Sequence, residues 1–447
     1  MGLTADLGAF LTGMRDNTYP AGALACVRTG FTDCVAVLLA GEREVVTQIV
    51  AASVGATERR NNSLLGQLRI PAPDAALVYG TAAHALDYDD TALSGHPSAV
   101  LVPAIIAEAV EGGADGQMMV KAYIAGYEVW AELIRRDRDQ HHDKGWHPSA
   151  VFGAIAAASA SAVLRGLDAE QATRALAIAA SLASGVVANF GSMTKPLQVG
   201  RAAQSGLLAA RLAQLGLTSS PDALEHGSGF LRAISPNGAV DTESAAAIGR
   251  EWRILQSGIN VKNYPICYAA HRVIDAMLDV VRTEDLKPED IAAVEVEIGQ
   301  TQAAMLRNSR PQSALDAKFS AEFAMASAAI VRRCGLSELC DAFVQRPEVQ
   351  AFFPRVQVVR ISDKDPDEPA HSPFDRVRVA LQNGRNIQAE PVYHPRGHFK
   401  RPLSTSDLWD KFSDCVSDVL APAAARHLFE NLQSIDTAES VSDIVPH

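Results

Sequence analysis

The first 265 or so residues of the chain follow a helical pattern of apolar positions. Apolar side chains recur at three- and four-residue spacings, and the interruptions are residues that start or end helices. Asp74 can begin a helix over residues 75–91, and residues 117–136 form another. Gly112-Gly113 and Gly166 are each placed to end a further helix. This part of the chain is therefore predicted to be all-helical.

After about residue 285 the apolar positions alternate at the period of a β-strand. The segments IAAVEVEIG (291–299) and RVQVVRI (355–361) place apolar side chains on one face, and 376–390 alternates around Asn383-Gly384, a strong hairpin signal. An Ala-rich helix is predicted near 318–333. The pattern predicts a smaller α+β domain with an antiparallel sheet.

Residues 405–434 become helical again, and a terminal helical piece usually packs on a helical body. We therefore expect a mainly α protein with a second α+β domain. The predicted boundaries are residues 1–268 with 402–447 for a discontinuous all-helical domain, and 269–401 for an α+β lid.

Composition supports tightly packed helices. The chain of 447 residues is 48% hydrophobic but only 6% aromatic, so Ala, Val, Leu and Ile must fill its interior. The run Ala175–Thr194 carries no charge over a length that could span a bilayer, but Ser, Gly and Asn dilute it. A helix buried in protein is the favoured interpretation, without a membrane partner.

Charge and cysteine usage exclude several classes of protein. The formal net charge is −12 with no basic tract, which argues against nucleic acid as a partner. The six cysteines form no C-x-x-C pair, so we expect reduced thiols in a cytoplasmic protein. Asp6 interrupts the N-terminus where an export signal would be apolar.

The pentapeptide His-Pro-Ser-Ala-Val occurs twice, at 96–100 and 147–151. Proline suits the first turn of a helix, so His96 and His147 are each predicted at a helix N-terminus. The unpaired N–H groups and the dipole there attract anions and keep an imidazole neutral. Two such ends facing one cavity would bind a carboxylate beside proton-transfer groups. The structural alternative is a motif that merely starts helices well.

The segment between the first predicted helix and His96 is acidic. His84, Asp87 and Thr91 stand at i, i+3 and i+7, which is one helix face. Three carboxylates crowd into residues 87–90, so one should have a raised pKa or lie against a cation. We interpret Asp89 and Asp90 as a solvated capping turn and Asp87 as the functional side chain.

Two lysines complete the polar set. Lys195 ends the uncharged run and is therefore expected to be paired or aimed at an anion. Lys262 precedes Tyr264-Pro265, and Cys267 beyond it is interpreted as a packing thiol. A four-residue S-x-x-K match and the three histidines at 141, 142 and 147 lack the partners that a β-lactamase-type or metal site requires. We expect no metal and no organic cofactor. The set suits removal of a proton from carbon next to a carboxylate.

The chain resembles the MmgE/PrpD family nearly end to end. Six ordered segments carry the resemblance: HALDYDDT…GHPSAVLVPA, GWHPSAVFGAIAAA, TKPLQVGRAAQSG, VKNYPICYAAH, DAKFSAEFAMA and YHPRGH. The resemblance implies a helical domain with an α+β lid, a homodimer, and cofactor-free chemistry on small polycarboxylates. It places the active site on Asp87, Thr91, His96, His147, Lys195 and Lys262.

The chain departs from the decarboxylases of the family at three places. Phe323 stands where they carry a tyrosine, the loop from Thr91 to His96 is one residue shorter, and Gln198 replaces a histidine. Phenylalanine donates no proton, so inversion of a carbon is favoured over decarboxylation.

We therefore predict an epimerase, most similar to iminodisuccinate epimerase. His96 and His147 are the acid/base pair, assisted by Asp87. Lys195 and Lys262 stabilise the enolate. Thr91, Gln198 and Tyr264 are expected to bind substrate. The alternatives are a 2-methylcitrate dehydratase-like or cis-aconitate-type lyase and, in another class, a helical scaffold protein without activity.

Overall fold

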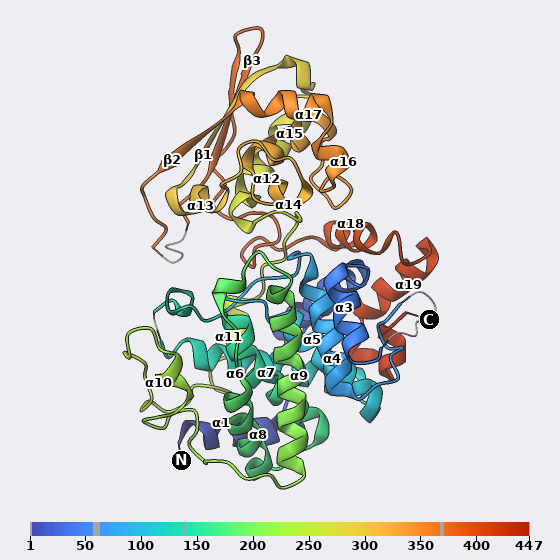
Figure 1. Ribbon diagram of the computed structural model, residues 1–447, viewed down its shortest axis with the longest axis vertical. Helices are drawn as coiled ribbons and strands as arrows, with labels where there is room; N and C mark the ends of the chain where they lie inside the picture. The colour runs from blue at the N-terminus through green and yellow to red at the C-terminus, as the bar shows by residue number, and fades with distance from the viewer. Residues whose placement is uncertain (1, 57–62, 138, 367–370, 447) are drawn as a thin grey trace. The chain divides into compact units, whose positions relative to one another are not determined.

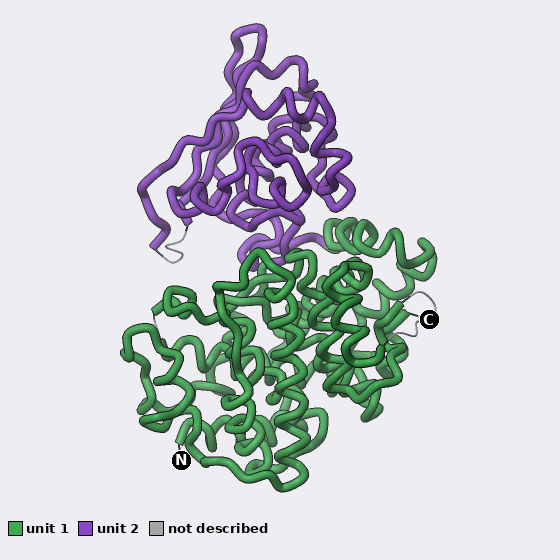
Figure 2. Tube along the Cα trace, in the orientation of Figure 1, with its two compact units in different colours: residues 1–260, 405–447 green, residues 261–404 purple. Residues whose placement is uncertain are grey.

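The chain forms two compact units (Figure 2). The computed structural model describes residues 2–56, 63–137, 139–366 and 371–446. Unit 1 comprises Met1–Asn260 and Thr405–His447, and unit 2 comprises Val261–Ser404. Unit 1 is helical and unit 2 combines helices with a small sheet (Figure 1), which confirms the predicted fold class.

Unit 1 is built from long helices followed by two short ones, and two more come from the C-terminal segment. They are α1 (Leu3–Met14), α2 (Ala21–Gly41), α3 (Val45–Ser53), α4 (Ala72–Ala85), α5 (Pro97–Gly112), α6 (Gly116–Ile134), α7 (Pro148–Arg165), α8 (Ala169–Leu182), α9 (Thr194–Gln214), α10 (Phe230–Ile234), α11 (Arg253–Ser257), α18 (Thr405–Val416) and α19 (Pro422–Gln433). Figure 1 shows α4, α5, α7 and α9 side by side in the middle of this unit.

Glycine lets α9 approach both α4 and α7 closely. A Cβ added to Gly200 would lie 2.2 Å from the carbonyl oxygen of Leu77 on α4, and one on Gly206 would lie 2.5 Å from the backbone nitrogen of Ala158 on α7. Only a residue without a side chain fits such a crossing. The small-residue composition thus brings together the C-terminal end of α4 and the N-terminal end of α9, where His84 and Lys195 lie.

Several predicted helix ends are confirmed. Helix α5 ends at Gly112 with Gly113 in the left-handed region (φ 74°), and α7 ends before Gly166 (φ 63°). The predicted helix over 75–91 is wrong at both ends, since α4 runs from Ala72 to Ala85 and Asp74 lies in its first turn. Asp87 has φ 52°, which no helix accepts, so the chain turns there.

The uncharged run Ala175–Thr194 is not one buried helix. Helix α8 ends at Leu182, and the segment that follows contains only a 3₁₀ turn at Val187–Asn189. Phe190 is 39% exposed in this segment. Among the described residues, α2 and α7 are long and apolar enough to cross a membrane, but 67% and 89% of their most apolar stretches are buried inside the protein.

Unit 2 contains a four-stranded sheet in the order β2-β1-β3-β4. Its elements are α12 (His271–Thr283), β1 (Ile291–Gly299), α13 (Gln300–Met305), α14 (Ala314–Ala317), α15 (Ala321–Val331), α16 (Asp341–Val344), α17 (Pro347–Phe352), β2 (Val356–Ile361), β3 (Arg376–Leu381) and β4 (Asn386–Gln388). Val294, Val296 and Ile298 point into the core of the unit, as their spacing predicts.

The predicted antiparallel sheet is right for β1–β3 and for the hairpin β3–β4, and wrong for β1–β2. Strands β1 and β2 are parallel because the helices α13–α17 lie between them in sequence and form a crossover connection. Periodicity identifies a strand but carries no information about the direction of its neighbour.

Candidate active site

An acidic turn follows α4 and is buried, contrary to the interpretation of Asp89 and Asp90 as solvated. Both side chains are 0% exposed. Burial raises the pKa of the Asp90 carboxyl well above its ordinary value, and the nearby Asp33 carboxyl adds to the effect. Asp87 lies against the ammonium of Lys195. The turn therefore shows both predicted outcomes of crowded carboxylates, a raised pKa and a cation partner.

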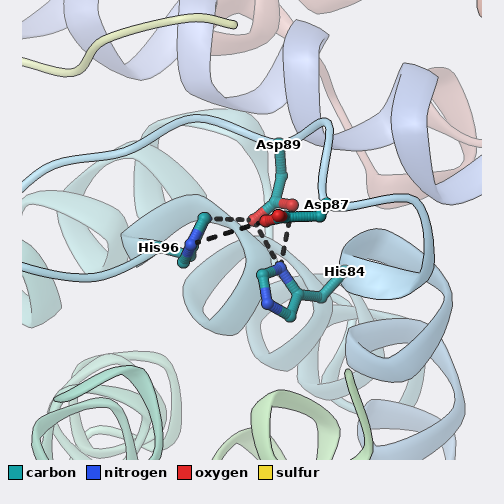
Figure 3. Close-up of side chains that lie close together, drawn as sticks. All are labelled: His84, Asp87, Asp89 and His96. Carbon is teal, nitrogen blue, oxygen red and sulfur yellow. Dashed lines mark hydrogen bonds and ion pairs between the residues drawn. The ribbon is translucent and has the colours of Figure 1, made fainter. Parts of the chain in front are cut away.

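Asp89 lies between two histidines. Its oxygens are 2.9 and 3.0 Å from Nδ1 of His84, and Oδ2 is 2.9 Å from Nδ1 of His96. Figure 3 shows the carboxylates of Asp87 and Asp89 meeting between the two rings. Burial alone would raise the pKa of Asp89, but His84 and His96 more than offset it, so the pKa lies well below its ordinary value. Asp89 is an ionised acceptor.

These contacts determine which ring nitrogen carries the proton. A carboxylate oxygen only accepts hydrogen bonds, so Nδ1 of His84 and of His96 must each donate. For His96 the Asp90 carbonyl oxygen, 3.0 Å from Nδ1, is a second acceptor. In the neutral imidazole the Nε2 lone pair is then left for proton transfer. Burial lowers the pKa of His84 to about 4 in spite of Asp89, so His84 is neutral at pH 7.

His147 is held in the same tautomer by a neutral amide. It stands at the N-cap of α7, and its Nδ1 is 2.7 Å from Oε1 of Gln198. Nε2 of that amide donates to the Val186 carbonyl at 3.0 Å, which fixes the amide with its oxygen toward the histidine. Burial, followed by the neighbouring His84, lowers the pKa of His147 to about 2. The expected neutral imidazole is present, but burial is its main cause.

The two His-Pro motifs converge around a third histidine. The ring centroid of His84 is 4.4 Å from that of His96 and 6.2 Å from that of His147. The motifs also contact each other, because the backbone N–H of His96 donates to the Ser149 hydroxyl at 3.1 Å. Three imidazoles from the C-terminal end of α4 and the N-caps of α5 and α7 thus form one cluster.

Lys195 forms an ion pair, which is one of the two arrangements that the sequence predicts for it. Its Nζ is 2.9 Å from Oδ1 of Asp87, and the same oxygen is 3.9 Å from Nε2 of His96. The exposed ring of Phe190 lies 5.2 Å from Nζ and packs edge-on against His147 at 4.8 Å. Asp87 therefore links the lysine to the histidine cluster.

The N-terminus of α5 is already occupied by a carboxyl group of the protein itself. The backbone N–H of Ser98 donates to Asp90 at 3.3 Å, and its hydroxyl contacts both Asp90 and the hydroxyl of Tyr123. The expectation that this helix end binds a substrate carboxylate is therefore wrong, because Asp90 takes the position of the anion.

A buried ion pair contacts the backbone of the acidic turn. Lys411 on α18 lies 2.5 Å from Asp33 on α2, and its Nζ also donates to the Tyr88 carbonyl at 2.8 Å. The C-terminal segment of unit 1 thus holds the turn from 323 residues away in sequence. No local pattern predicts such a contact.

The remaining predicted site residues occupy both units. Thr91 forms a β-bridge with Asn260 in unit 1. Lys262 and Tyr264 are buried residues of unit 2, where the Tyr264 hydroxyl is 2.5 Å from Asp275. Both amide atoms of Gln198 are hydrogen-bonded within the protein, the oxygen to His147 and the nitrogen to the Val186 carbonyl. The substrate-binding roles of Thr91, Gln198 and Tyr264, and the convergence of Lys262 with Lys195, stay predictions.

Two side chains of the cluster were not assigned to the site from sequence, His84 and Asp89. The spacing of His84 and Asp87 places both on one face of a helix, but a continuous helix would keep Asp89 on another face. The signal that could have found them is the second carboxylate of Asp87-Tyr88-Asp89, which lies five residues after His84.

Comparison with known proteins identifies the family of the chain. Residues 5–243 match the model of the MmgE/PrpD N-terminal domain, and residues 264–436 match that of the C-terminal domain. The chain belongs to the MmgE/PrpD family.

Curated relatives of this MmgE/PrpD protein are named cis-aconitate decarboxylase. The mouse enzyme (Mus musculus) is 26% identical over 98% of the chain and 92% of its own length. The human enzyme (Homo sapiens) is 28% identical over 84% and 79%, and that of Aspergillus terreus is 26% identical over 78% and 75%. The family match supports an enzyme and not a scaffold.

Proposed function

We propose that this MmgE/PrpD protein is a cofactor-independent epimerase, which inverts a carbon next to a carboxylate in a small polycarboxylate, with iminodisuccinate as the first substrate to test. The observation that carries the proposal is the cluster of imidazoles in which His96 and His147 flank His84. An inversion needs a proton acceptor and a proton donor that act on opposite faces of one carbon.

The surroundings of the two histidines divide the roles. His147 has an uncharged partner in Gln198 and a pKa lowered by burial to about 2, so it is neutral and fits the acceptor. His96 has a carboxylate at each ring nitrogen, since Nδ1 contacts Asp89 at 2.9 Å and Nε2 lies 3.9 Å from Oδ1 of Asp87, and a carboxylate accepts an N–H at either position. His96 fits the donor.

In the proposed reaction the C–H proton moves to Nε2 of His147, and the electron pair of that bond forms an enolate. Lys195 exchanges Asp87 for a substrate carboxylate and stabilises the added negative charge. Nε2 of His96 then returns a proton to the other face of the same carbon. One C–H bond is broken and one is formed, so only the configuration changes. The reverse direction exchanges the two roles. We propose that Lys262 assists and that the enzyme acts as a homodimer.

A second candidate is a lyase of the cis-aconitate decarboxylase type, which the names of the curated relatives favour. Decarboxylation would break a C–C bond, release CO₂ and leave a carbanion that His96 protonates. The lack of a hydroxyl at Phe323 is only a weak argument against decarboxylation. This ring is fully buried in the core of unit 2, where it packs edge-on against Phe343.

A panel of small di- and tricarboxylates incubated with the protein in D₂O separates these reactions. An epimerase incorporates deuterium at the α-carbon and converts one stereoisomer into its epimer, which NMR and chiral chromatography detect. Release of CO₂ with a product one carbon shorter would establish the decarboxylase instead. An unsaturated acid formed with loss of water would establish a dehydratase.

A further inference from the structure

The cluster of His84, Asp87, Asp89 and His96 allows two uses that exclude each other. One potential ligand atom from each side chain lies within 4.8 Å of the others, close enough for a metal ion to draw them together. The same atoms can instead share protons in a hydrogen-bonded network. The two uses differ in whether Nδ1 of each histidine carries a lone pair or a proton.

The contact distances favour the hydrogen-bonded network over a metal ion. Two ligands of one tetrahedral zinc ion lie roughly 3.3 Å apart when each bond is about 2.0–2.1 Å. Nδ1 of His84 and of His96 are both 2.9 Å from an oxygen of Asp89, which is the distance of an N–H···O hydrogen bond. His96 Nδ1 has a second acceptor in the Asp90 carbonyl. The fourth group, Asp87, already holds the ammonium of Lys195 at 2.9 Å.

We propose that Asp89 is the positioning residue of the active site. Its two oxygens accept the Nδ1–H groups of His84 and His96 and hold both rings with Nε2 directed away from the carboxylate, so that Nε2 of His96 is left for proton transfer. The proposal deepens the proposed function, since it explains how a buried carboxylate without access to substrate controls the proton-transfer groups. His84 is bound by this arrangement as firmly as His96. Its Nε2 is buried and has no hydrogen-bond partner among the described residues.

The chemistry of a carboxylate makes the proposal specific. Asp89 offers two acceptors, and the structure uses both. Asparagine has the same shape but offers one acceptor and one NH₂ donor. In Asp89→Asn the amide oxygen accepts from one Nδ1–H, and the NH₂ group faces the other Nδ1–H at hydrogen-bond distance. Donor then opposes donor even though the Asp90 carbonyl remains as an acceptor for His96, so the ring that faces the NH₂ group must turn or move its proton to Nε2. The second ring then has no lone pair at Nε2.

The matched control is Asp90→Asn. Asp90 is the adjacent residue, is equally buried and has a raised pKa, so a neutral amide resembles the group already present. Its contact with His96 comes from the backbone carbonyl, which the substitution keeps. The tautomers of all histidines should be unchanged in this variant.

The test is two-bond ¹H–¹⁵N NMR of the full chain labelled at its histidine rings, which reads tautomers without any substrate. The wild type should show His84 and His96 as Nδ1–H. Asp89→Asn should show one of them as Nε2–H, with kcat lowered about 10²–10⁴-fold and KM changed little, as for other carboxylates that orient a catalytic histidine.

Three results would overturn the proposal. They are Nε2–H tautomers in the wild type, unchanged tautomers in Asp89→Asn, and stoichiometric binding of added Zn²⁺ that removes the Nδ1–H signals and raises activity. If Asp89→Asn does not fold, the wild-type spectrum alone still decides. The spectra do not depend on the reaction, so failure of the epimerase assay leaves this test intact.

Discussion

The two copies of His-Pro-Ser-Ala-Val have the same local structure and opposite electrostatic surroundings. Both histidines are helix N-caps followed by proline at the first helical position. His96 faces carboxylates, whereas His147 faces the amide of Gln198 and is more deeply buried. Five identical residues thus set the position of an imidazole, and residues brought to it from elsewhere set which groups face its ring nitrogens. The proposed difference between a donor and an acceptor would therefore arise from the tertiary structure.

The largest expected effect comes from removing each imidazole in turn. Glutamine keeps a polar side chain of similar length but cannot transfer a proton. His147→Gln and His96→Gln should each lower kcat about 10²–10⁴-fold, the usual contribution of general acid–base catalysis. Circular dichroism should show folded protein, and the surface variant His427→Gln should keep full activity.

The same pair of variants tests the division of roles. With one epimer of the substrate in D₂O, the variant that keeps the acceptor for that epimer should still exchange its α-proton without inverting the carbon, and the other variant should not exchange. Equal loss of exchange in both variants with both epimers would contradict the two-base arrangement.

A second prediction concerns stability at low pH. His147 has a folded-state pKa of about 2, below the value near 6.5 of an unfolded histidine. The unfolded chain therefore binds the extra proton first, so this stabilisation is present above pH 6.5 and is lost as the pH falls toward the folded pKa. From pH 7 to 5 the loss is about 2 kcal/mol, because each pH unit below 6.5 costs about 1.4 kcal/mol.

The measurement is urea unfolding of wild type and His147→Gln at both pH values. The wild type should lose about 2 kcal/mol more than the variant, since the variant has no imidazole to protonate at this position. The comparison between the two proteins cancels the contributions of other groups, such as Asp90. An identical pH dependence would show that His147 is solvated in the folded protein.

The sequence predicts features that depend on neighbouring residues. The caps at Gly113 and Gly166 and the hairpin at Asn383-Gly384 follow from local backbone preferences, and the structure confirms them. The helix predicted through residue 91 fails because Asp87 adopts a positive φ. Lys411 holds the adjacent Tyr88 carbonyl from the far end of the chain.

Contacts from distant parts of the chain also explain why the interpretation of Asp89 and Asp90 as solvated is wrong. Three carboxylates in four residues suggest a solvated surface, because burial of charge is expensive without partners. Here the partners are His84, His96 and Ser98, of which only the first lies on the preceding helix. The aspartates could be recognised as chemically important from their type, but their burial depends on partners that only the folded chain brings to them.

The smallest expected effect comes from giving His147 the kind of partner that His96 has. In Gln198→Glu a carboxylate replaces the amide beside Nδ1, at the 2.7 Å contact. A negative charge there favours the imidazolium, so the pKa of His147 should rise from its low value. The neutral acceptor becomes less populated near pH 6, and kcat/KM should fall about tenfold there while recovering at higher pH, as expected for a general base.

The pH profile of kcat/KM and the ¹⁵N shifts of His147 measure this change together. The matched control is Gln204→Glu, which adds the same charge to the same helix next to Asp74 and away from the imidazoles. If Gln198→Glu leaves the profile unchanged, the surroundings of His147 do not set its role, and the contrast between the two motifs has no catalytic meaning. If the acidic limb moves upward in this variant alone, the identity of one buried side chain accounts for the difference between the two copies.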